Sequence, residues 1–456
     1  MKTATVPQRT TLPVLSSRPD IDEELLLDCV HCGLCTAACP TYLETGLEAD
    51  SPRGRIYLMR GVIEGSIALD EVVKGHLDLC LNCRACETAC PSGVQYGKLI
   101  EPFRVHLTRT GQQVQRMPWI QRLVLRHVFP YRGRSRFLLR PVAWMQRWGL
   151  DRWLDRTGML RLLPSSIRRL HEMLPPLSRH YGKLPAVMPA EGKRRARVAV
   201  FLGCVADAVY PQTNWNTIRV LQKNGCEVVI PRDQVCCGAL HYHLGEEDPA
   251  RAFAQRNLRA FGFAGDETTA NCDAVVVNAA GCGAMLKDYH HLMHHTADEE
   301  PARRFSAKVR DVSEFLVGLG LVPPQHPVHI RATYHDACHL CHAQQIRKPP
   351  RQILEAIPGL RLEPLTESEV CCGAAGSYNL SQPEMAERLG ERKIRWIQET
   401  GAEAVFTANP GCLLQIARHL RRDLPSVWAA HPIDVLWAAY SGHHPRSGHE
   451  AVSYVE

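Results

Sequence analysis

The residues of this chain best suited to chemistry are its cysteines, of which there are 19 in 456 residues. Eight of them form two copies of one pattern, Cys-x2-Cys-x2-Cys-x3-Cys-Pro, separated by 51 residues at every cysteine. The copies comprise Cys29, Cys32, Cys35 and Cys39, then Cys80, Cys83, Cys86 and Cys90. A zinc site needs four ligands and has no use for the third cysteine of each run. The pattern instead predicts two [4Fe–4S] clusters.

This spacing is the signature of bacterial ferredoxins, in which three thiolates of a run bind one cluster and the fourth binds the other. The ligand sets are therefore expected to cross between the runs. We expect Cys29, Cys32, Cys35 and Cys90 to hold the first cluster, and Cys80, Cys83, Cys86 and Cys39 to hold the second. Two clusters arranged in this way form a short path for electrons.

A second duplication occupies the C-terminal part of the chain. Cys204, the pair Cys236 and Cys237 followed by Gly238, and Cys282 recur as Cys338, the pair Cys371 and Cys372 followed by Gly373, and Cys412. Three hypotheses for these eight cysteines stay open: a further iron–sulfur centre, a zinc or structural site, and a reactive dithiol. His335, Asp336 and His339 lie close to Cys338 in the sequence, either as additional ligands or as hydrogen-bond partners of ligands.

Strands and helices alternate in the predicted structure of both C-terminal repeats, which favours α/β units with a parallel sheet. The expected strands of the first repeat are 198–202, 226–230 and 274–278, and those of the second are 328–334, 360–362 and 404–408. The expected helices are 249–261 and 383–400. Such an arrangement places the cysteines near the carboxyl ends of strands, where α/β proteins usually bind ligands.

The N-terminal region between the two ferredoxin runs has apolar residues at helical spacing (Ile56, Met59, Val62 and Ile63). We therefore predict a mixed fold with four parts. An α-helical ferredoxin-like domain with two [4Fe–4S] clusters occupies residues 1–103, and an Arg-rich helical connecting region occupies 104–195. Two α/β Cys-Cys-Gly repeats follow at 196–323 and 324–456.

The connecting region carries most of the positive charge. The whole chain has a net charge of +7, but residues 104–197 contain 21 Lys and Arg against four Asp and Glu. Amphipathic patterns in 117–128 (Trp119, Ile120, Leu123, Val124) and around Ile167, Leu170 and Leu174 leave three hypotheses open. These are contact with an anionic membrane surface, a partner-subunit surface, and a solvated helix face. Nucleic-acid binding is not expected, because no recognition motif accompanies the charge.

Composition excludes several protein classes. Hydrophobic residues make up 45% and charged residues 22%, which is ordinary for a globular protein and unlike a disordered or coiled-coil chain. No apolar run is long enough to span a bilayer, and the first twenty residues lack the apolar core of a signal peptide. We expect a cytoplasmic protein, with peripheral membrane contact as a further hypothesis.

Four histidines gather in one short stretch of the chain, at His290, His291, His294 and His295. They indicate either a metal site or a solvated helix.

Five stretches carry a family resemblance. They are YHDACHLCHAQQ (334–345), EVCCGAAGSYN (369–379), ANPGCLLQ (408–415), SPRGR (51–55) and CLNCRACETACPSGVQYGKLIE (80–101). Together they resemble the iron–sulfur subunits of bacterial glycolate oxidase. The Cys-Cys-Gly pattern also resembles the cysteine-rich domain of the heterodisulfide reductases, which can hold a non-cubane [4Fe–4S] cluster. Ala279 and Asn409 stand where that family has a further cysteine.

The resemblance implies a complex with flavin-containing subunits. FAD in those partners would oxidise glycolate to glyoxylate, and this chain would pass the electrons toward quinone or another acceptor, without catalytic residues of its own. The absence of a Gly-x-Gly-x-x-Gly fingerprint agrees with a flavin located elsewhere. Related architectures leave two alternatives: the iron–sulfur subunit of a lactate or glycerol-3-phosphate dehydrogenase, and a thiol/disulfide reductase of the heterodisulfide type.

Overall fold

The computed structural model describes residues 21, 23–112, 123–124, 126–159, 168, 171–177, 182, 184–265 and 271–445. The chain divides into two compact units. The first comprises residues 1–116 together with 243–246, and the second comprises 117–242 together with 247–456. No helix in the described ranges is long and apolar enough to cross a membrane.

The first unit is helical, as the apolar spacing predicts. Its helices are α1 (Glu23–Leu27), α2 (Pro40–Thr45), the 3₁₀ turn η1 (Glu48–Asp50), α3 (Pro52–Ile63), α4 (Glu71–Asp78), α5 (Ala85–Thr88) and α6 (Gly97–Arg109). Ser51 caps α3 by accepting a hydrogen bond from the backbone N–H of Gly54. Met59, Leu77, Leu99 and Phe103 are fully buried and form the core of this unit.

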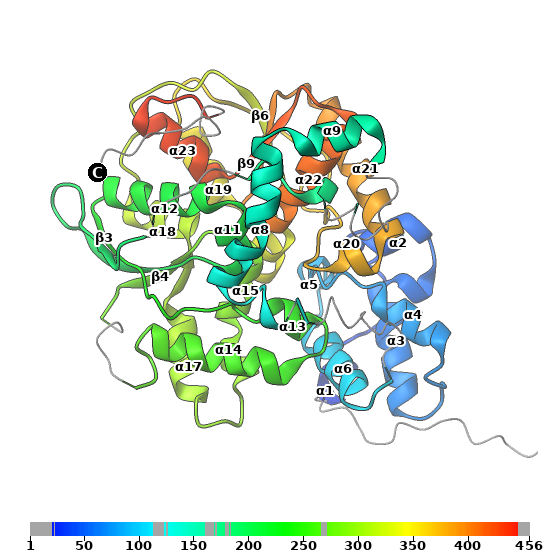
Figure 1. The fold of residues 1–456 in the computed structure, drawn as a ribbon. Helices are drawn as coiled ribbons and strands as arrows, with labels where there is room; N and C mark the ends of the chain where they lie inside the picture. Colours follow the sequence, from blue (N-terminus) through cyan, green and yellow to red (C-terminus); the bar gives the residue numbers. More distant parts are fainter. Residues whose placement is uncertain are drawn as a thin grey trace, which may run out of the picture. The chain divides into compact units, whose positions relative to one another are not determined.

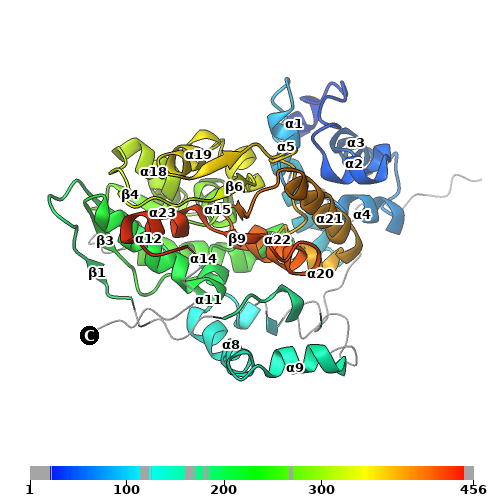
Figure 2. The ribbon, with the colours of Figure 1, turned by 90° about the horizontal axis from the view of Figure 1, so that it is seen from above.

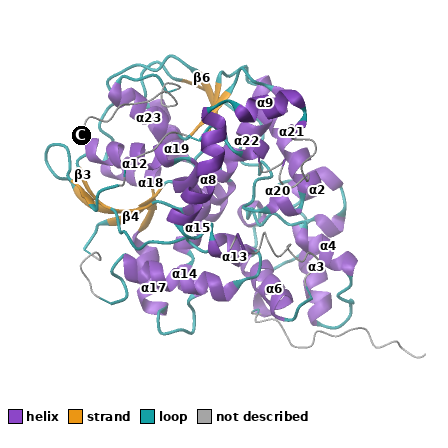
Figure 3. Cartoon of the chain, viewed as in Figure 1, coloured by secondary structure: helices purple, strands orange, loops and turns teal. Residues whose placement is uncertain are grey.

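Two sheets form the second unit, and Figure 3 shows them as separate groups of strands. Their strands are β1 (Val187–Met188), β2 (Ala196–Phe201), β3 (Cys226–Val229), β4 (Ala274–Val277), β5 (Val309–Asp311), β6 (Arg331–Tyr334), β7 (Arg361–Glu363), β8 (Ala404–Phe406) and β9 (Trp428–Ala430). The strand orders are β1-β3-β2-β4-β5 and β7-β6-β8-β9. All pairs are parallel except β1 with β3. The predicted α/β class is confirmed, with β5 and β9 added at equivalent edges.

The second unit also contains helices before, between and after its strands. They are α8 (Arg132–Arg147), α9 (Leu150–Thr157), α11 (Cys204–Val209), α12 (Pro211–Lys223), α13 (Ala239–His243), α14 (Glu247–Ala260), α15 (Ala280–Lys287), α16 (Tyr289–Leu292), α17 (Glu299–Lys308), α18 (Val312–Leu319), the π-helical turn η4 (His339–Ala343), α19 (Lys348–Glu355), α20 (Tyr378–Ser381), α21 (Pro383–Glu399), α22 (Pro410–Asp423) and α23 (Pro432–Ser441). Figure 1 shows α12, α18, α19 and α23 grouped in one part of this unit.

The two repeats pack against each other through equivalent elements. Helix α12 of the first repeat packs on α23 of the second, and α18 packs on α19, as Figure 2 shows for α12 and α23. Residues from both sheets and from these four helices belong to one continuous core, which includes Leu221, Leu316, Leu354 and Leu436. Because each helix buries its apolar face against the other repeat, the pair of repeats is a single packed body.

Candidate iron–sulfur and metal centres

The backbone of the two ferredoxin runs repeats its conformation as well as its cysteines. His31 and Asn82, 51 residues apart, have φ angles of 53° and 52°. Gly33 and Arg84, also 51 residues apart, have φ angles of 85° and 59°. Left-handed residues between cysteines turn the chain sharply, so that thiols three residues apart can face one centre. At Arg84 the cost of this conformation is offset by an ion pair with Glu101 at 3.2 Å.

Four cysteines from both runs line one cavity in the first unit. Cys39 comes from the first run, whereas Cys80, Cys83 and Cys86 come from the second. Burial raises the pKa of Cys86 strongly, and the neighbouring thiols of Cys83, Cys80 and Cys39 raise it further. Four thiolates this close repel one another unless a cation binds between them, so the donor set fits a cluster of iron ions. This is the crossed grouping that the sequence predicts.

A buried arginine stands beside this cavity. Arg55 has an exposed fraction of 1%, and its Nη1 lies 4.0 Å from Cys39 Sγ. Its remaining nitrogens donate to Thr41 Oγ1 at 3.1 Å and to the carbonyl of His76 at 2.7 Å. Burial acts to lower the pKa of Arg55, but the charges of Cys80, Tyr96 and Cys39 outweigh it and raise the pKa. Arg55 thus places a permanent positive charge next to the cysteine group.

Backbone and side-chain donors hold the second run in place. The N–H of Asn82 donates to Cys80 Sγ at 3.4 Å, and its side chain donates to Glu101 at 2.5 Å. His243 also bonds Glu101, at 2.8 Å. Although burial alone would raise the pKa of Glu101, Arg84 and His243 lower it to about 2. Glu101 is therefore an ionised anchor that fixes the left-handed residues Asn82 and Arg84.

The other predicted set is nearer the surface. Cys32 is exposed, whereas Cys29 and Cys90 are half-buried and pack on the same apolar core. Burial raises the pKa of Cys35, and the charges of Cys29 and Cys39 act in the same direction. Because Cys39 also acts on Cys35, and Cys80 and Cys86 contact the same core, the grouping of Cys29, Cys32, Cys35 and Cys90 stays a prediction.

In the first Cys-Cys-Gly repeat the thiols of Cys204 and Cys236 lie 3.4 Å apart. Cys237 interacts with Cys282, which stands in the first turn of α15. The hydrogen bond with the Cys236 thiol and burial raise the pKa of Cys204 well above its usual range. Gly238 is required here, because its φ is 89° and a Cβ would lie 3.1 Å from the backbone of Ala250.

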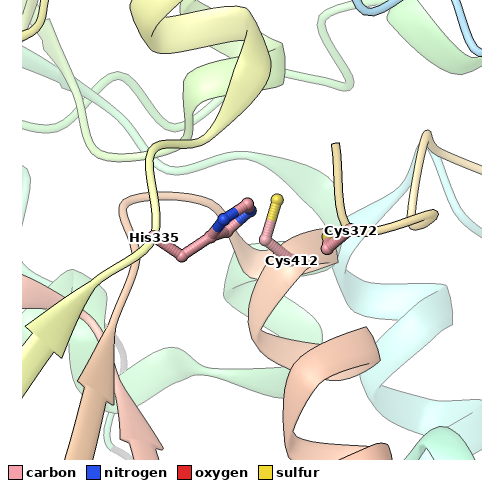
Figure 4. Close-up of side chains that lie close together, drawn as sticks. All are labelled: His335, Cys372 and Cys412. Atoms are coloured by element: carbon pink, nitrogen blue, oxygen red, sulfur yellow. The ribbon is translucent and has the colours of Figure 1, made fainter. Parts of the chain in front are cut away.

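The second repeat keeps these pairings, because Cys372 likewise interacts with Cys412, and it adds a histidine. Cys338 Sγ lies 4.0 Å from Cys371 Sγ. His335 follows β6, Cys372 lies in the Cys-Cys-Gly loop and Cys412 opens α22, and their donor atoms all lie within 4.8 Å of one another (Figure 4). Burial, and then the charge of Lys393, lowers the pKa of His335 well below its usual range, so the imidazole is neutral. A neutral imidazole and thiolates are the donor forms that metals bind.

Comparisons with known proteins cover most of the chain. A model of the 4Fe-4S dicluster domain matches residues 25–94, and a model of the cysteine-rich domain matches 198–287 and 332–417. The linker-region model of the glycolate oxidase iron-sulfur subunit matches residues 116–174. The probable glycolate oxidase iron-sulfur subunit of Bacillus subtilis is 39% identical over 93% of this chain and 96% of the relative. The chain belongs to the family of glycolate oxidase iron–sulfur subunits.

Further relatives show how widely the architecture of this family is shared. The glycolate oxidase iron-sulfur subunit of Escherichia coli is 34% identical over 87% of this chain and 90% of that protein. Lactate utilization protein A of Shouchella clausii is 32% identical over 52% of this chain and 98% of that protein. The dicluster match supports iron–sulfur clusters as the cofactors of this glycolate oxidase family member.

The polar residues predicted near Cys338 have different roles in the structure. His335 joins Cys372 and Cys412 rather than Cys338. Asp336 forms an ion pair with Arg351 at 2.6 Å, and His339 is half-buried outside the two close donor groups found among the described residues. The four histidines at 290–295 also lie outside those groups. His290 and His291 lie in α16, whereas His294 follows that helix and pairs with Glu299 at 3.1 Å.

Sequence reasoning missed Arg55 and Lys393 as parts of these sites. Arg55 shares a buried helix face with Ile56, Met59 and Val62. A charged residue on an otherwise apolar face is a signal for a buried ionic role, because burying an unpaired charge is costly. Lys393 is similarly placed on the buried face of α21, with Leu389 and Ile397.

Proposed function

We propose that this chain is the electron-transfer subunit of a glycolate-oxidising complex. In this proposal, FAD in partner subunits oxidises glycolate to glyoxylate, and the electrons pass through this chain toward quinone or another acceptor. Cys29, Cys32, Cys35 and Cys90 hold one [4Fe–4S] cluster, and Cys80, Cys83, Cys86 and Cys39 hold the other. The observation that carries the proposal is the cavity that groups Cys39 with Cys80, Cys83 and Cys86.

The chain's own residues suit it to moving electrons rather than binding a substrate. [4Fe–4S] clusters exchange single electrons when they are bound. Arg55 and the N–H of Asn82 point at cysteines of one set and favour its more negative, reduced form, because both place positive charge near the sulfurs. The crossed ligand sets hold the two centres on one small helical unit. In this arrangement the two-electron oxidation of the substrate occurs at a flavin in a partner subunit, and this chain carries only single electrons.

The test is to purify the chain anaerobically, alone and with its partner subunits. Two clusters predict about eight iron atoms and as many sulfides per chain. The chain alone is expected to show no oxidation of glycolate, whereas in the complex glycolate should reduce its clusters, as followed by EPR. Glycolate oxidation by the isolated chain, or anaerobic material free of iron and acid-labile sulfide, would contradict the proposal.

Lactate and glycerol 3-phosphate are the substrates of the alternative complexes. The similarity to lactate utilization protein A makes lactate the natural competitor. Adding glycolate, lactate or glycerol 3-phosphate in turn to the intact complex discriminates these hypotheses. Glycolate should reduce the clusters at a lower concentration than lactate or glycerol 3-phosphate does. Reduction at a lower concentration of either competitor would identify that competitor as the substrate.

We propose further that the complex meets a membrane through the α8–α9 surface, defined here by the exposed side chains of Phe137, Leu138, Trp144, Trp148 and Trp153. Exposed arginines are interleaved with these aromatic residues along α8, and Arg140 lies over the Phe137 ring at 5.7 Å. Aromatic and arginine side chains on one helix face suit the interface of an anionic lipid bilayer. Trp144 and Trp148 are exposed by 59% and 71%, and clustered exposed tryptophans favour an interaction surface over a solvated helix face.

A further inference from the structure

Large apolar side chains are exposed around the first ferredoxin run. Four of them are more than half exposed, namely Leu27, Val30, Leu34 and Tyr57. Leu27 ends helix α1, Val30 and Leu34 lie between the cysteines of the run, and Tyr57 belongs to α3. Cys32 is exposed in the same loop. We call these five residues the first-run surface, and exposed apolar side chains gathered in this way are typical of an interaction site.

The loop of the first run is fixed to helix α3. The ring of Tyr57 packs edge-on against His31 at 6.3 Å between centroids. Arg53 donates to the carbonyl of His31 at 3.0 Å, and its guanidinium occupies the space in which a Cβ of Gly33 would lie. Glu48 accepts from Nη2 of Arg53 at 3.1 Å. Because these contacts already order the loop, its exposed apolar side chains lose little conformational entropy on binding a partner.

The surroundings of the first-run surface are acidic. Between residues 20 and 52 the sequence has eight Asp and Glu and no Lys or Arg. Glu24, Asp28 and Glu48 of this set are exposed. Such carboxylates repel an anionic membrane and attract a protein surface that carries Lys and Arg. Since the α8–α9 surface has arginines among its aromatic residues, the two exposed apolar surfaces suit different partners.

The cysteines of the two expected clusters differ in their access to solvent. Cys32 of the first set is exposed, whereas Cys39, Cys80 and Cys83 of the second set are buried. Electron transfer between proteins slows steeply with distance, so the redox group of a partner must approach one of these sets closely. The first set allows the closer approach, and the first-run surface is where that approach would occur.

We propose that the first-run surface docks a flavin-containing partner subunit through basic side chains of that partner, and that electrons enter the chain there. The proposal rests on the proposed function, in which the flavin belongs to a partner. The reduced flavin gives up two electrons, one at a time, to the oxidised [4Fe–4S] centre of the first set, and its two protons pass to solvent. Each electron leaves that centre for the second before the next arrives, and the flavin returns to its oxidised form.

The test measures binding of the full chain, purified anaerobically with its clusters, to the flavin-containing subunits. Combining Val30→Ser with Leu34→Ser should weaken binding at least about tenfold, because apolar area is lost from the interface. Asp28→Lys should weaken binding and make it less sensitive to salt. Val72→Ser and Glu71→Lys on α4 are matched controls that should bind as the wild type does, since Val72 is 66% exposed against 68% for Val30.

The variants also distinguish other occupants of the surface. Unchanged binding in both the apolar and the charge variant, or equal weakening in the controls, would overturn the docking proposal. If the apolar variant keeps its partner but loses binding to phosphatidylglycerol vesicles, or loses self-association, the surface belongs to a membrane or to a second copy of the chain, and the proposal is again overturned.

Two further measurements separate the possible failures. The iron content of each variant reports whether both clusters are intact. If a variant loses iron, hydrogen exchange of the wild-type chain decides, because the amides of residues 24–35 should exchange more slowly in the complex, and equal exchange would overturn the proposal. The proposed function fails separately if glycolate does not reduce the clusters of the wild-type complex, whatever the variants bind.

Discussion

Single residues beside the cysteines determine the electrostatics of the proposed clusters. Arg55 is buried 4.0 Å from Cys39 Sγ and carries its charge into a region with several thiolates. It also lies 3.7 Å from the carboxylate of Asp50, so its charge is partly balanced within the protein. Because a positive charge stabilises the reduced form of a cluster, we expect Arg55 to raise the reduction potential of the centre it faces.

Replacing Arg55 by methionine should lower that potential. The shift expected is roughly 60 mV, a tenfold change in the one-electron equilibrium. An EPR-monitored potentiometric titration measures it. Arg55→Lys keeps the charge and should recover most of the shift, whereas Arg60→Met removes an exposed arginine of the same helix that pairs with Glu64. An unchanged or more positive potential in R55M would show that Arg55 has another role.

The crossed ligand sets give a second prediction at this scale. Cys39→Ser should damage the cluster of Cys80, Cys83 and Cys86, because Cys39 lines their cavity. Cys90→Ser should instead damage the cluster of the first run. Iron content and the EPR signals of the two centres measure these losses. If each serine variant instead damages the cluster of its own run, the crossed assignment is excluded.

At the scale of elements, left-handed residues and helix starts position the cysteines. Arg84 and Asn82 adopt positive φ and are fixed by Glu101, while Cys412 and Cys282 stand in first helical turns.

A different element, α8, has an exposed face. Arg132 and Arg136 anchor it to Asp207 at 2.8 and 2.9 Å, which leaves the opposite aromatic residues exposed. An anchored helix with exposed tryptophans is a rigid docking surface.

Replacing both Trp144 and Trp148 by alanine should weaken binding to anionic vesicles. Each buried aromatic side chain contributes on the order of 1.5 kcal/mol, so at least about a tenfold loss is expected. Co-sedimentation with phosphatidylglycerol vesicles measures binding, and Val72→Ala, an exposed apolar residue of α4, serves as the control. Vesicle binding that is unchanged, with loss of the partner subunits on purification, would assign the α8–α9 surface to a partner.

At the scale of the whole molecule, duplication has produced two different results. The ferredoxin runs keep the same cysteines and the same left-handed backbone, which is what two equivalent clusters require. The Cys-Cys-Gly repeats keep their sheets and the contacts of α12 with α23 and of α18 with α19, but their sites differ at the equivalent positions Phe201 and His335. The repeats also meet beside the cysteines, because Ala280 of the first repeat shares a buried cluster with Cys372 and Cys412 of the second.

The sequence alone determined the cysteine spacing, both duplications and the α/β class of the repeats, because these depend on local order along the chain. The helix of Ile56, Met59 and Val62 was predictable for the same reason. The tertiary structure alone placed Arg55 beside Cys39, and moved His335 away from Cys338 to Cys372 and Cys412. Such neighbours are set by packing between segments far apart in the chain, and hydrophobic periodicity carries no information about which buried polar groups will meet.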